Sequence, residues 1–376
     1  MFSQTSSKCE ISNLGENAIV EYIRNLPCTR IRRGDSATTS WVGSDCADLR
    51  TLAPQLSNLV MSKDLLIENV HFLTKWIPAD WLAAKSLRVN LSDLAAGGAT
   101  PVSCLLGLAL PRNRPWSWLK VFLDRFSKEC VLQNVALLGG DVTESETLVI
   151  SLTVMGSSEA SQAVSRAQAK TGDLLCVTGN LGDSAAGLDL IKSWVGEKSE
   201  KSRSLSPSAN EIFKKFSGDQ RRLVLRHYLP RNRRMAGVQL ASMGVRSMMD
   251  LSDGLLGDAT KMARASRCQF HFEISKIPIS QALKTVCAET PQRALKYAVV
   301  GGEDYELLCA IEPSRFSRCA SELLRHGCGL TVIGRVGAGR ESDVDMGASV
   351  IWESELEARE LDLADWRSYE GFRFQT

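Results

Sequence analysis

The sequence predicts a mixed α/β chain of two domains, covering residues 1–156 and 157–376. Short apolar runs that are typical of strands alternate with longer amphipathic stretches that are typical of helices. The chain has 376 residues, enough for two domains of ordinary size with separate cores. A Ser-, Ala- and Gln-rich connection over residues 157–170 separates the two sets of elements and sets the predicted boundary.

In the first half, apolar periodicity predicts helices over 12–26, 78–97 and 115–132, and strands over 58–72, 103–110, 135–138 and 148–156. The helix over 78–97 has Asp80 as a candidate cap at its start and Gly97-Gly98 as its end. Residues 28–40 are polar and basic, which favours a loop.

In the second half we expect strands over 173–178, 269–274 and 330–336 and near Val350, with helices after Gly182, over 250–266 and over 313–326. The glycines of 179–187 permit a tight turn into a helix N-terminus, a favourable place for an anion. Asp250 and Asp253 either cap the helix that follows or are delivered from the core by a strand over 247–249.

Composition excludes several classes of protein. With 44% hydrophobic and 23% charged residues, the chain has the composition of an ordinary globular protein. Its net charge of +2 does not indicate nucleic-acid binding. Its eleven cysteines include no C-x-x-C pair, which indicates free thiols in a reducing compartment. The N-terminus is polar and the longest apolar run is too short to cross a bilayer, so we expect a cytoplasmic protein without a membrane anchor.

Acidic residues recur in apolar surroundings. Asp93 lies in the Ala- and Leu-rich run 89–101, and Asp253 lies in the similar run 250–255. Asp64 and Asp141 follow strand-like runs, and Gly139-Gly140 before Asp141 would let a backbone approach a phosphate closely. Ionised carboxylates in such surroundings are costly unless cations neutralise them. The pattern predicts a site in which carboxylates from distant segments come together. Such a site would bind Mg²⁺ and phosphates.

A polar stripe lies along the helix predicted over 78–97. Ser86, Asn90 and Asp93 are spaced by four and three, which puts them on one helical face. The stripe belongs either to this acidic site or to a buried hydrogen-bond network.

Residues 196–234 are strongly basic, with eleven Lys and Arg against four Asp and Glu. The pattern favours a solvated insertion followed by a helix, and attraction of phosphate ligands or RNA is the alternative. The chain has no P-loop, protein-kinase, zincin or nucleophile-elbow motif, so phosphoryl transfer here would be of another type.

Five segments, read in order, resemble the bacterial thiamine-monophosphate kinase family of the aminoimidazole ribonucleotide synthetase-like superfamily: residues 89–96, 139–141, 182–188, 250–255 and 301–307. The resemblance spans about Leu14 to Phe372. It implies two α/β domains, with the N-terminal domains pairing into a β-barrel at a homodimer interface. It also implies that ATP and thiamine monophosphate bind between the domains and across the dimer, the N-terminal domain holding ATP and Mg²⁺.

The resemblance implies roles for individual residues. Asp64, Asp93 and Asp253 are the implied catalytic residues. The implied Mg²⁺ ligands, direct or indirect, are Asp45, Ser62, Asp64, Asp93, Asp141, Asp250 and Asp253. The implied ATP contacts are Gly140, Asp141, Arg166 and Ser252, and the implied contacts to thiamine monophosphate are His71, Glu303 and Tyr369.

Phosphoryl-transfer chemistry agrees with this resemblance. The acceptor phosphate is already ionised near neutral pH, so the catalyst needs to neutralise charge and align two anions and needs no general base. We therefore expect direct in-line transfer from ATP to thiamine monophosphate without a phosphoenzyme.

Two positions depart from the family pattern. The chain has Gly43-Ser44-Asp45 where the family shows Gly-Asp-Asp, and Ser62-Lys63-Asp64 where the family shows a Ser/Thr-Thr-Asp run. Our hypothesis for Lys63 is that its ammonium stands in for one Mg²⁺ or reaches a phosphate. Two alternative functions stay open: a sister enzyme of the superfamily that activates another small molecule with ATP, and a non-catalytic binder of thiamine phosphates or nucleotide.

Overall fold

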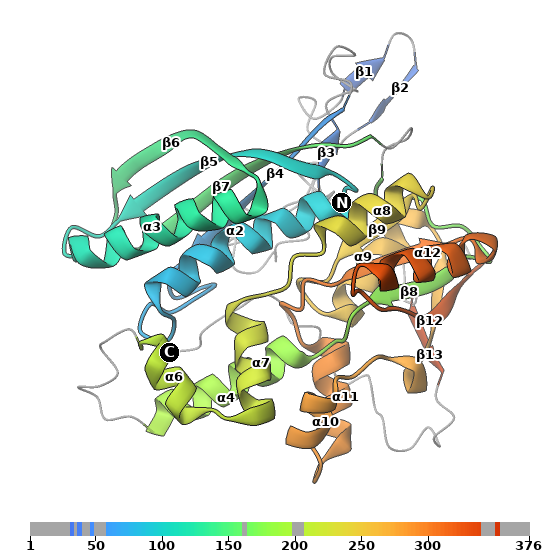
Figure 1. The fold of residues 1–376 in the computed structure, drawn as a ribbon. Coiled ribbons are helices and arrows are strands. Elements are labelled where there is room, and N and C mark those ends of the chain that lie inside the picture. The colour runs from blue at the N-terminus through green and yellow to red at the C-terminus, as the bar shows by residue number, and fades with distance from the viewer. Residues whose placement is uncertain are drawn as a thin grey trace, which may run out of the picture.

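Figure 1 shows the computed structural model of the chain. It describes residues 31–33, 36–39, 46–48, 58–159, 164–197, 207–339 and 350–353. The helix predicted over 12–26, the implied metal ligand Asp45 and the implied substrate contact Tyr369 lie outside these residues. The predicted α/β class is confirmed, because two separate sheets are each covered by helices.

The first sheet has five strands in the order β3-β4-β7-β5-β6. They are β3 (Ala47–Asp48), β4 (Leu59–Ile67), β5 (Thr100–Leu110), β6 (Ala136–Glu144) and β7 (Val149–Ser157). Only β5 and β6 pair in parallel. In β7, Ile150, Leu152 and Val154 are fully buried while the residues between them are partly exposed, so one face carries the core.

Two helices cover that buried face, α2 (Ala79–Ala96) and α3 (Trp116–Gln133) (Figure 1). The prediction that Asp80 caps α2 is wrong, because Pro78 is the cap residue and makes no side-chain cap bond. The predicted glycine end is confirmed: Gly98 takes the left-handed conformation, with φ of 64°. A Cβ at Gly98 would also lie 2.4 Å from the Cβ of Ala241, so glycine is required there.

The second sheet has six strands in the order β13-β10-β12-β8-β11-β9. They are β8 (Leu174–Thr178), β9 (Ser247–Asp250), β10 (Gln269–Glu273), β11 (Leu307–Ile311), β12 (Leu330–Gly337) and β13 (Val350–Glu353). Strands β8 and β11 are buried along their whole length, which explains their unbroken apolar sequences. One face packs on α9 (Leu255–Ser266) and α11 (Pro291–Val300), the other on α8 (Arg234–Ser242) and α12 (Pro313–Arg325).

Of the remaining helices that the structure describes, α4 (Asp183–Glu197), α6 (Ala209–Lys215) and α7 (Gly218–Tyr228) join the two halves. Helix α10 (Gln281–Val286) packs on α4 and α7. Apolar residues of α4, α6 and α7 belong to the same core as the first sheet and α2. The ring of Tyr228 on α7, for example, lies 5.4 Å from that of Trp81 on α2. Helices from beyond residue 157 thus complete the core of the first sheet.

Two local predictions are corrected here. Residues 28–40 were expected to form a loop, but β1 (Ile31–Arg33) and β2 (Ser36–Thr39) form a two-stranded antiparallel sheet. The basic segment 196–234 is more helical than expected, with α6 and α7 ahead of α8. Its cations are also partly structural, since Arg226 and Arg233 are bonded to buried Glu306.

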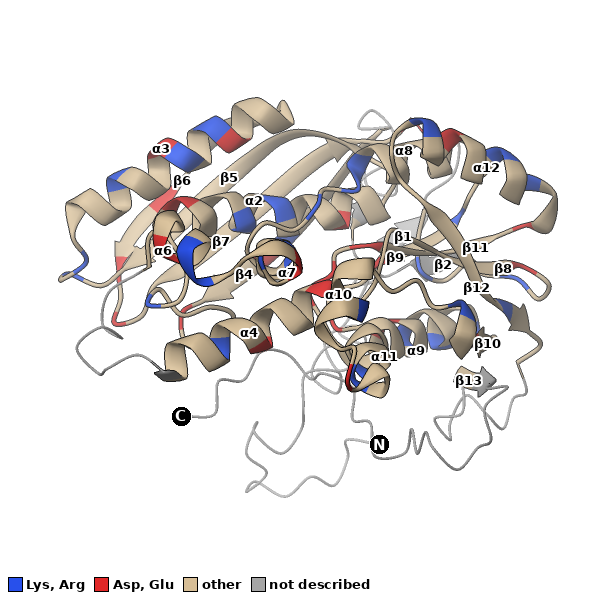
Figure 2. Ribbon diagram, turned by 60° about the horizontal axis from the view of Figure 1, so that its bottom comes forward, with Lys and Arg blue, Asp and Glu red and all other residues tan. Residues whose placement is uncertain are grey.

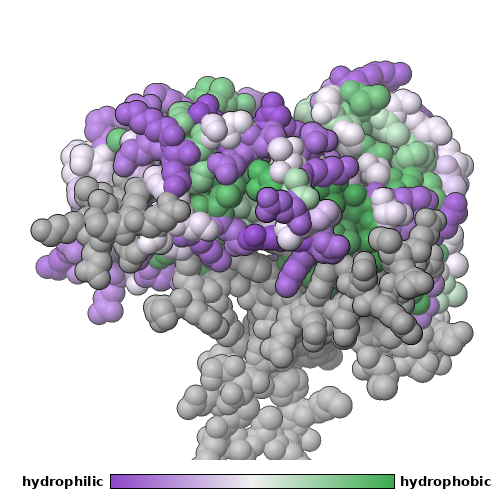
Figure 3. Space-filling model, turned by 90° about the horizontal axis from the view of Figure 1, so that it is seen from below, coloured by the Kyte–Doolittle hydropathy of each residue, from purple (hydrophilic) through white to green (hydrophobic). Residues whose placement is uncertain are grey.

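The surface carries both signs of charge. Figure 2 shows Lys and Arg interspersed with Asp and Glu on α3, α6, α7 and α12. Seen from below, hydrophilic residues predominate, with apolar ones showing between them near the middle of the face (Figure 3). Every cysteine in the described ranges is a free thiol, and none of the helices described there is long and apolar enough to span a bilayer.

Candidate functional site

One part of the site joins β4 to α2. The hydroxyl of Ser62 donates to the Asp93 carboxylate over 2.6 Å, and the thiol of Cys46 donates to the Asp93 carbonyl over 3.1 Å. Asp93 therefore faces β4 from the last turns of α2. Ser86 and Asn90, on the same polar stripe, instead bond carbonyls of their own helix, so the stripe divides between a hydrogen-bond network and the site.

A second part is the loop between α11 and β11. The backbone N–H of Glu303 donates to the Ser252 carbonyl over 2.8 Å, and that of Tyr305 donates to the Leu251 carbonyl over 2.9 Å. Glu303 and Tyr305 both have left-handed backbones, with φ of 65° and 52°. The loop thus lies against the turn after β9. Asp250 is the last residue of β9, as expected from the alternative in which a strand over 247–249 delivers the acids from the core.

Four carboxylates lie near enough to the partly buried side chain of Tyr305 to affect its charge. Burial raises the pKa of the Tyr305 phenol well above its ordinary value, and the negative charges of Glu303, Asp250, Asp64 and Asp253 raise it further. These four charges come from β4, the end of β9, the turn that follows it and the 301–306 loop. The structure therefore brings Asp64 from the first half of the chain together with three acidic residues from the second half.

Asp253 is neutralised by a lysine of the following helix. Lys261 donates to the carboxylates of both Asp253 and Asp258, the second over 3.1 Å. Asp258 also accepts the backbone N–H of Asp253 over 2.9 Å. Burial is the main cause that raises the pKa of Asp258 to about 6. Asp253 keeps a side chain that is 37% exposed, so it remains accessible to a ligand.

The acidic residues offer hard oxygen donors, which suit Mg²⁺. Among the residues that the structure describes, no three His, Cys, Asp or Glu side chains come close enough to hold one ion together. Mg²⁺ usually binds through one or two carboxylates, with waters and substrate phosphates completing the shell. The pair of Ser62 and Asp93 and the separate group around Tyr305 fit that mode of binding.

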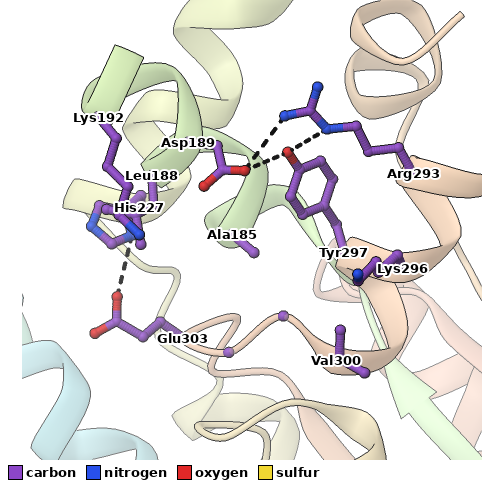
Figure 4. Close-up of a pocket in the computed structure, with 12 residues that line it drawn as sticks. Ala185, Leu188, Asp189, Lys192, His227, Arg293, Lys296, Tyr297, Val300 and Glu303 are labelled. Atoms are coloured by element: carbon purple, nitrogen blue, oxygen red, sulfur yellow. Dashed lines mark hydrogen bonds and ion pairs between the residues drawn. The ribbon is translucent and has the colours of Figure 1, made fainter. Parts of the chain in front are cut away.

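Beside Glu303 a cavity of about 450 Å³ opens between α4, α7 and α11. Figure 4 shows Glu303 and His227 on one side of it and Asp189, Tyr297 and Arg293 on the other. The cavity is lined by Ala185, Leu188, Asp189, Lys192, His227, Arg293, Lys296, Tyr297, Val300, Gly301, Gly302 and Glu303. Its volume and its mixture of apolar and polar lining residues are compatible with a small-molecule site.

Glu303 is held by two residues that the sequence analysis did not identify. Lys85 donates to its carboxylate over 3.0 Å, and Nδ1 of His227 lies 3.2 Å from the same oxygen. Burial lowers the pKa of His227 well below its usual value, so the imidazole is neutral near pH 7. The predicted substrate contact His71 lines a small adjoining cavity with Lys85 and His227. The structure thus places His71 and Glu303 in neighbouring parts of one region.

The helix N-terminus after Gly182 already has an anion of the chain itself. The carboxylate of Asp304 accepts the backbone N–H of Gly182 over 2.6 Å and that of Ser184 over 3.2 Å. Burial raises the pKa of Asp304 to about 7. A phosphate is therefore not needed to satisfy this turn, and the acid next to Glu303 has a structural role.

Glu306 ties the same loop to the second sheet. It accepts the Thr178 hydroxyl over 2.7 Å and is bound by Arg233 through two bonds of 2.5 and 2.7 Å. Arg226 adds a bond of 2.9 Å to this buried carboxylate. Asp304 and Glu306 therefore fix the loop, whereas Glu303 faces the cavity.

Other predicted residues lie apart from this group. Gly140 and Asp141 are inside β6, which runs past its predicted end, and a Cβ at Gly140 would lie 1.7 Å from the Leu106 carbonyl. Ser252 is next to Asp253, whereas Arg166 lies in the connection between β7 and β8 and accepts the Ser266 hydroxyl through its carbonyl. The strand predicted over 58–72 is shorter in the structure, where β4 ends at Ile67, so Asp64 lies inside the strand and His71 lies beyond its end.

Lys63 points to the other face of β4 from Ser62. Its ammonium donates to the hydroxyl of Ser151 on β7, on the sheet face that the helices leave open. Within one chain, the structure therefore gives no support to the hypothesis that this ammonium stands in for a Mg²⁺ beside Asp64 and Asp93.

Comparison with known families gives a match over most of the chain. Residues 43–158 match the model of the AIR synthase related protein, N-terminal domain. Residues 170–347 match the model of the AIR synthase related protein, C-terminal domain. The first match contains all five strands of the first sheet, and the second contains every strand of the second sheet except β13.

Individual relatives extend this likeness. The chain is 34% identical to the thiamine-monophosphate kinase of Escherichia coli K12 over 91% of its own length and 95% of the relative's. Among solved structures, it superposes on AaThiL complexed with AMPPCP and TMP with a TM-score of 0.72, 27% identity and coverage of 92% and 96% of the two chains. The thiamine monophosphate kinase of Aquifex aeolicus gives a TM-score of 0.65 at 30% identity, covering 79% and 89%.

Proposed function

This chain belongs to the thiamine-monophosphate kinase family of AIR synthase related proteins, and we propose that the site around Tyr305 carries out that family's reaction. The enzyme transfers the γ-phosphoryl group of ATP to the phosphate of thiamine monophosphate and forms thiamine diphosphate. A solved relative complexed with AMPPCP and TMP supports both substrates. The resemblance seen in the five motifs is thereby confirmed.

The observation that carries this proposal is that Asp64, Asp250, Asp253 and Glu303 all act on Tyr305, beside a cavity of about 450 Å³. Lysines pair with two of these acids, Lys261 with Asp253 and Lys85 with Glu303. Cations and phosphates would offset the remaining negative charge. The cavity is large enough for one thiamine monophosphate, whose phosphate would then lie at the acidic end.

We assign Mg²⁺ to these acids, with ATP as the co-substrate. Asp64, Asp93, Asp250 and Asp253 would hold the ions, with Ser62 orienting Asp93 through its 2.6 Å bond. Bound Mg²⁺ would neutralise the two phosphate groups and hold them in line. The chain's own contribution is positioning, since Lys85 and the neutral His227 fix Glu303.

Product formation tests the proposal. Purified protein with ATP, Mg²⁺ and thiamine monophosphate should yield thiamine diphosphate, measured by separating the thiamine phosphates. Asp253→Asn should lower kcat by about a hundredfold or more, since it removes charge that the transition state needs. Asp124→Asn, at an exposed ion pair on α3, serves as the control with wild-type activity. A folded wild type that binds thiamine monophosphate but forms no product would instead be the non-catalytic binder.

We also propose that the enzyme is a homodimer joined through the first sheet. Large apolar side chains are exposed on its strands, namely Leu65, Val102, Leu105, Leu137, Leu138 and Val142. Strand β6 is an edge strand with every residue exposed, which a second copy could pair with or cover. Within one chain, two strands separate Asp141 on β6 from Asp64 on β4, about 14 Å at ordinary strand spacing. A partner subunit is therefore the better source of the Asp141 carboxylate.

The two domains, each built on one sheet, have different roles in this proposal. We propose residues 1–156 as the ATP- and Mg²⁺-binding domain, with Gly140 as an ATP contact. Residues 157–376 form the C-terminal domain, which would add Arg166 and Ser252 as ATP contacts. The substrate contacts His71 and Glu303 come from different halves, which puts thiamine monophosphate between them. We place the enzyme in the cytoplasm, where free cysteines persist as thiols.

A further inference from the structure

The side of the cavity away from the acids carries a second polar group. Asp189 on α4 and Tyr297 and Arg293 on α11 lie opposite Glu303, with Ala185 between the two sides (Figure 4). Asp189, Tyr297 and Arg293 lie outside the five sequence motifs. Because they lie opposite Glu303, they would contact a different part of the substrate from the part that Glu303 contacts.

The direction in which the substrate lies follows from the chemistry. The reacting phosphate must be at the acidic end, near Asp64 and Asp253. The thiazolium ring comes next and is a cation, so it is favoured beside the carboxylate of Glu303. The aminopyrimidine ring is then left for the far side, at Asp189 and Tyr297. A reversed substrate would put its phosphate among Lys192, Arg293 and Lys296, away from the groups that handle phosphoryl transfer.

Asp189 is held in place from one side. The Tyr297 hydroxyl donates to Oδ2 of Asp189 over 2.7 Å. Arg293 donates to the Tyr297 oxygen over 2.8 Å, and its Nη2 lies 3.5 Å from the same Oδ2. Burial and the adjacent carboxylate raise the pKa of Tyr297, so the phenol remains a donor at physiological pH. Both neighbours therefore act on Oδ2.

The second carboxylate oxygen of Asp189 has no hydrogen-bond donor among the residues that the structure describes. The side chain is 42% exposed and lines the cavity, so Oδ1 is accessible to a ligand. An ionised carboxylate can only accept, so the partner it selects must be a donor. The exocyclic amino group of the pyrimidine is the one strong donor at that end of thiamine monophosphate.

We propose that Asp189 is a specificity residue that accepts a hydrogen bond from the pyrimidine amino group, with Tyr297 and Arg293 as its positioning residues. This inference rests on the proposed function, because it takes thiamine monophosphate as the ligand. A site that binds a substrate amino group through a carboxylate discriminates against an analogue with an acceptor in that place.

The test compares two substrates, thiamine monophosphate and oxythiamine monophosphate, in which a carbonyl oxygen replaces the amino group. Wild type should prefer thiamine monophosphate by about tenfold or more in kcat/KM. Asp189→Asn should reverse the preference: the amide oxygen keeps accepting from Tyr297, so its NH₂ faces the ligand and donates to the carbonyl. Its KM for thiamine monophosphate should rise about tenfold.

Tyr297→Phe should narrow the preference without reversing it, because Asp189 keeps its charge but loses its orientation. Asp124→Asn, remote on α3, should keep the wild-type preference. Equal losses on both substrates in Asp189→Asn, or no change, would overturn the inference. If wild type forms no product, the proposed function has failed, and calorimetric dissociation constants for the two compounds still decide whether Asp189 discriminates between them.

Discussion

Glu306 shows how one buried charge fixes the loop that carries the site. It lies immediately before β11 of the second sheet, fully buried, with Thr178, Arg226 and Arg233 bonded to its two oxygens. Because both arginines are also largely buried, each relies on this carboxylate for neutralisation.

We therefore expect Glu306→Gln to destabilise the protein by about 3–5 kcal/mol, since it leaves two buried guanidinium groups without a counter-ion. Denaturant unfolding followed by fluorescence measures this. The control is Glu312→Gln, which removes an exposed ion pair with Arg315 and should change stability far less. Equal effects of the two substitutions would mean that the buried network contributes little.

At the level of single residues, the sequence predicted acids better than their partners. Asp64, Asp250, Asp253 and Glu303 were identified because each lies in a recognisable local pattern, and the structure gathers them. Lys85 and His227 were missed because their partner Glu303 is distant in sequence: 218 positions separate it from Lys85. A lysine inside the buried, Ala-rich part of α2 was the available signal.

The helices α2 and α8 approach each other unusually closely. A Cβ at Gly237 would lie 2.0 Å from the Ala95 carbonyl oxygen, so the two backbones are in direct contact there. This contact joins the last turn of α2, which carries Asp93, to the layer of helices on the second sheet. Glycine at this position is needed for space, with its backbone in an ordinary helical conformation.

Gly237→Ala should cost about 1–3 kcal/mol, because the helices must move apart. It should also weaken turnover by shifting Asp93 away from Ser62. Gly196→Ala, where nothing lies within 4 Å, is the matched control in α4 and should stabilise the protein by at most about 1 kcal/mol. Thermal unfolding of both variants measures the difference, and a neutral Gly237→Ala would contradict the close contact.

Whole elements were predictable where periodicity was strong. Helices α2, α3 and α12 and strands β7, β8 and β12 lie within a few residues of their predicted bounds. Strand β6 was predicted too short because backbone pairing continues through polar residues that interrupt the apolar pattern: its pairing with β5 extends to Glu144. Strand β4 was predicted too long, since it ends at Ile67 and not near residue 72. Helices α10 and α11 were not anticipated, and with them the far side of the cavity.

At the scale of the whole molecule, the position of Asp141 makes the dimer testable. If each site takes Asp64 from one subunit and Asp141 from the other, Asp64→Asn and Asp141→Asn proteins should both be inactive alone. A heterodimer of one Asp64→Asn subunit and one Asp141→Asn subunit then has one site in which both aspartates are present. Random mixing should therefore recover about a quarter of wild-type activity.

The measurement is turnover after co-expression of the two variants or joint refolding. Sedimentation shows whether the mixture is dimeric. Mixing either variant with Asp253→Asn protein serves as a second pairing whose recovery reports which subunit supplies Asp253. Dimers that recover no activity in the first pairing would place Asp141 in the same subunit's site, or outside the site altogether.

The core shared by the first sheet and helices α4, α6 and α7 has a consequence for synthesis of the protein. The five strands of that sheet are all translated by residue 157, yet Trp194, Phe216 and Tyr228, which bury its helical layer, emerge later. A nascent chain paused at the end of β7 would expose uncovered Trp81 and Leu87 to the ribosome's surroundings. Chaperone binding during elongation should accordingly peak before α7 leaves the exit tunnel and fall once it has docked.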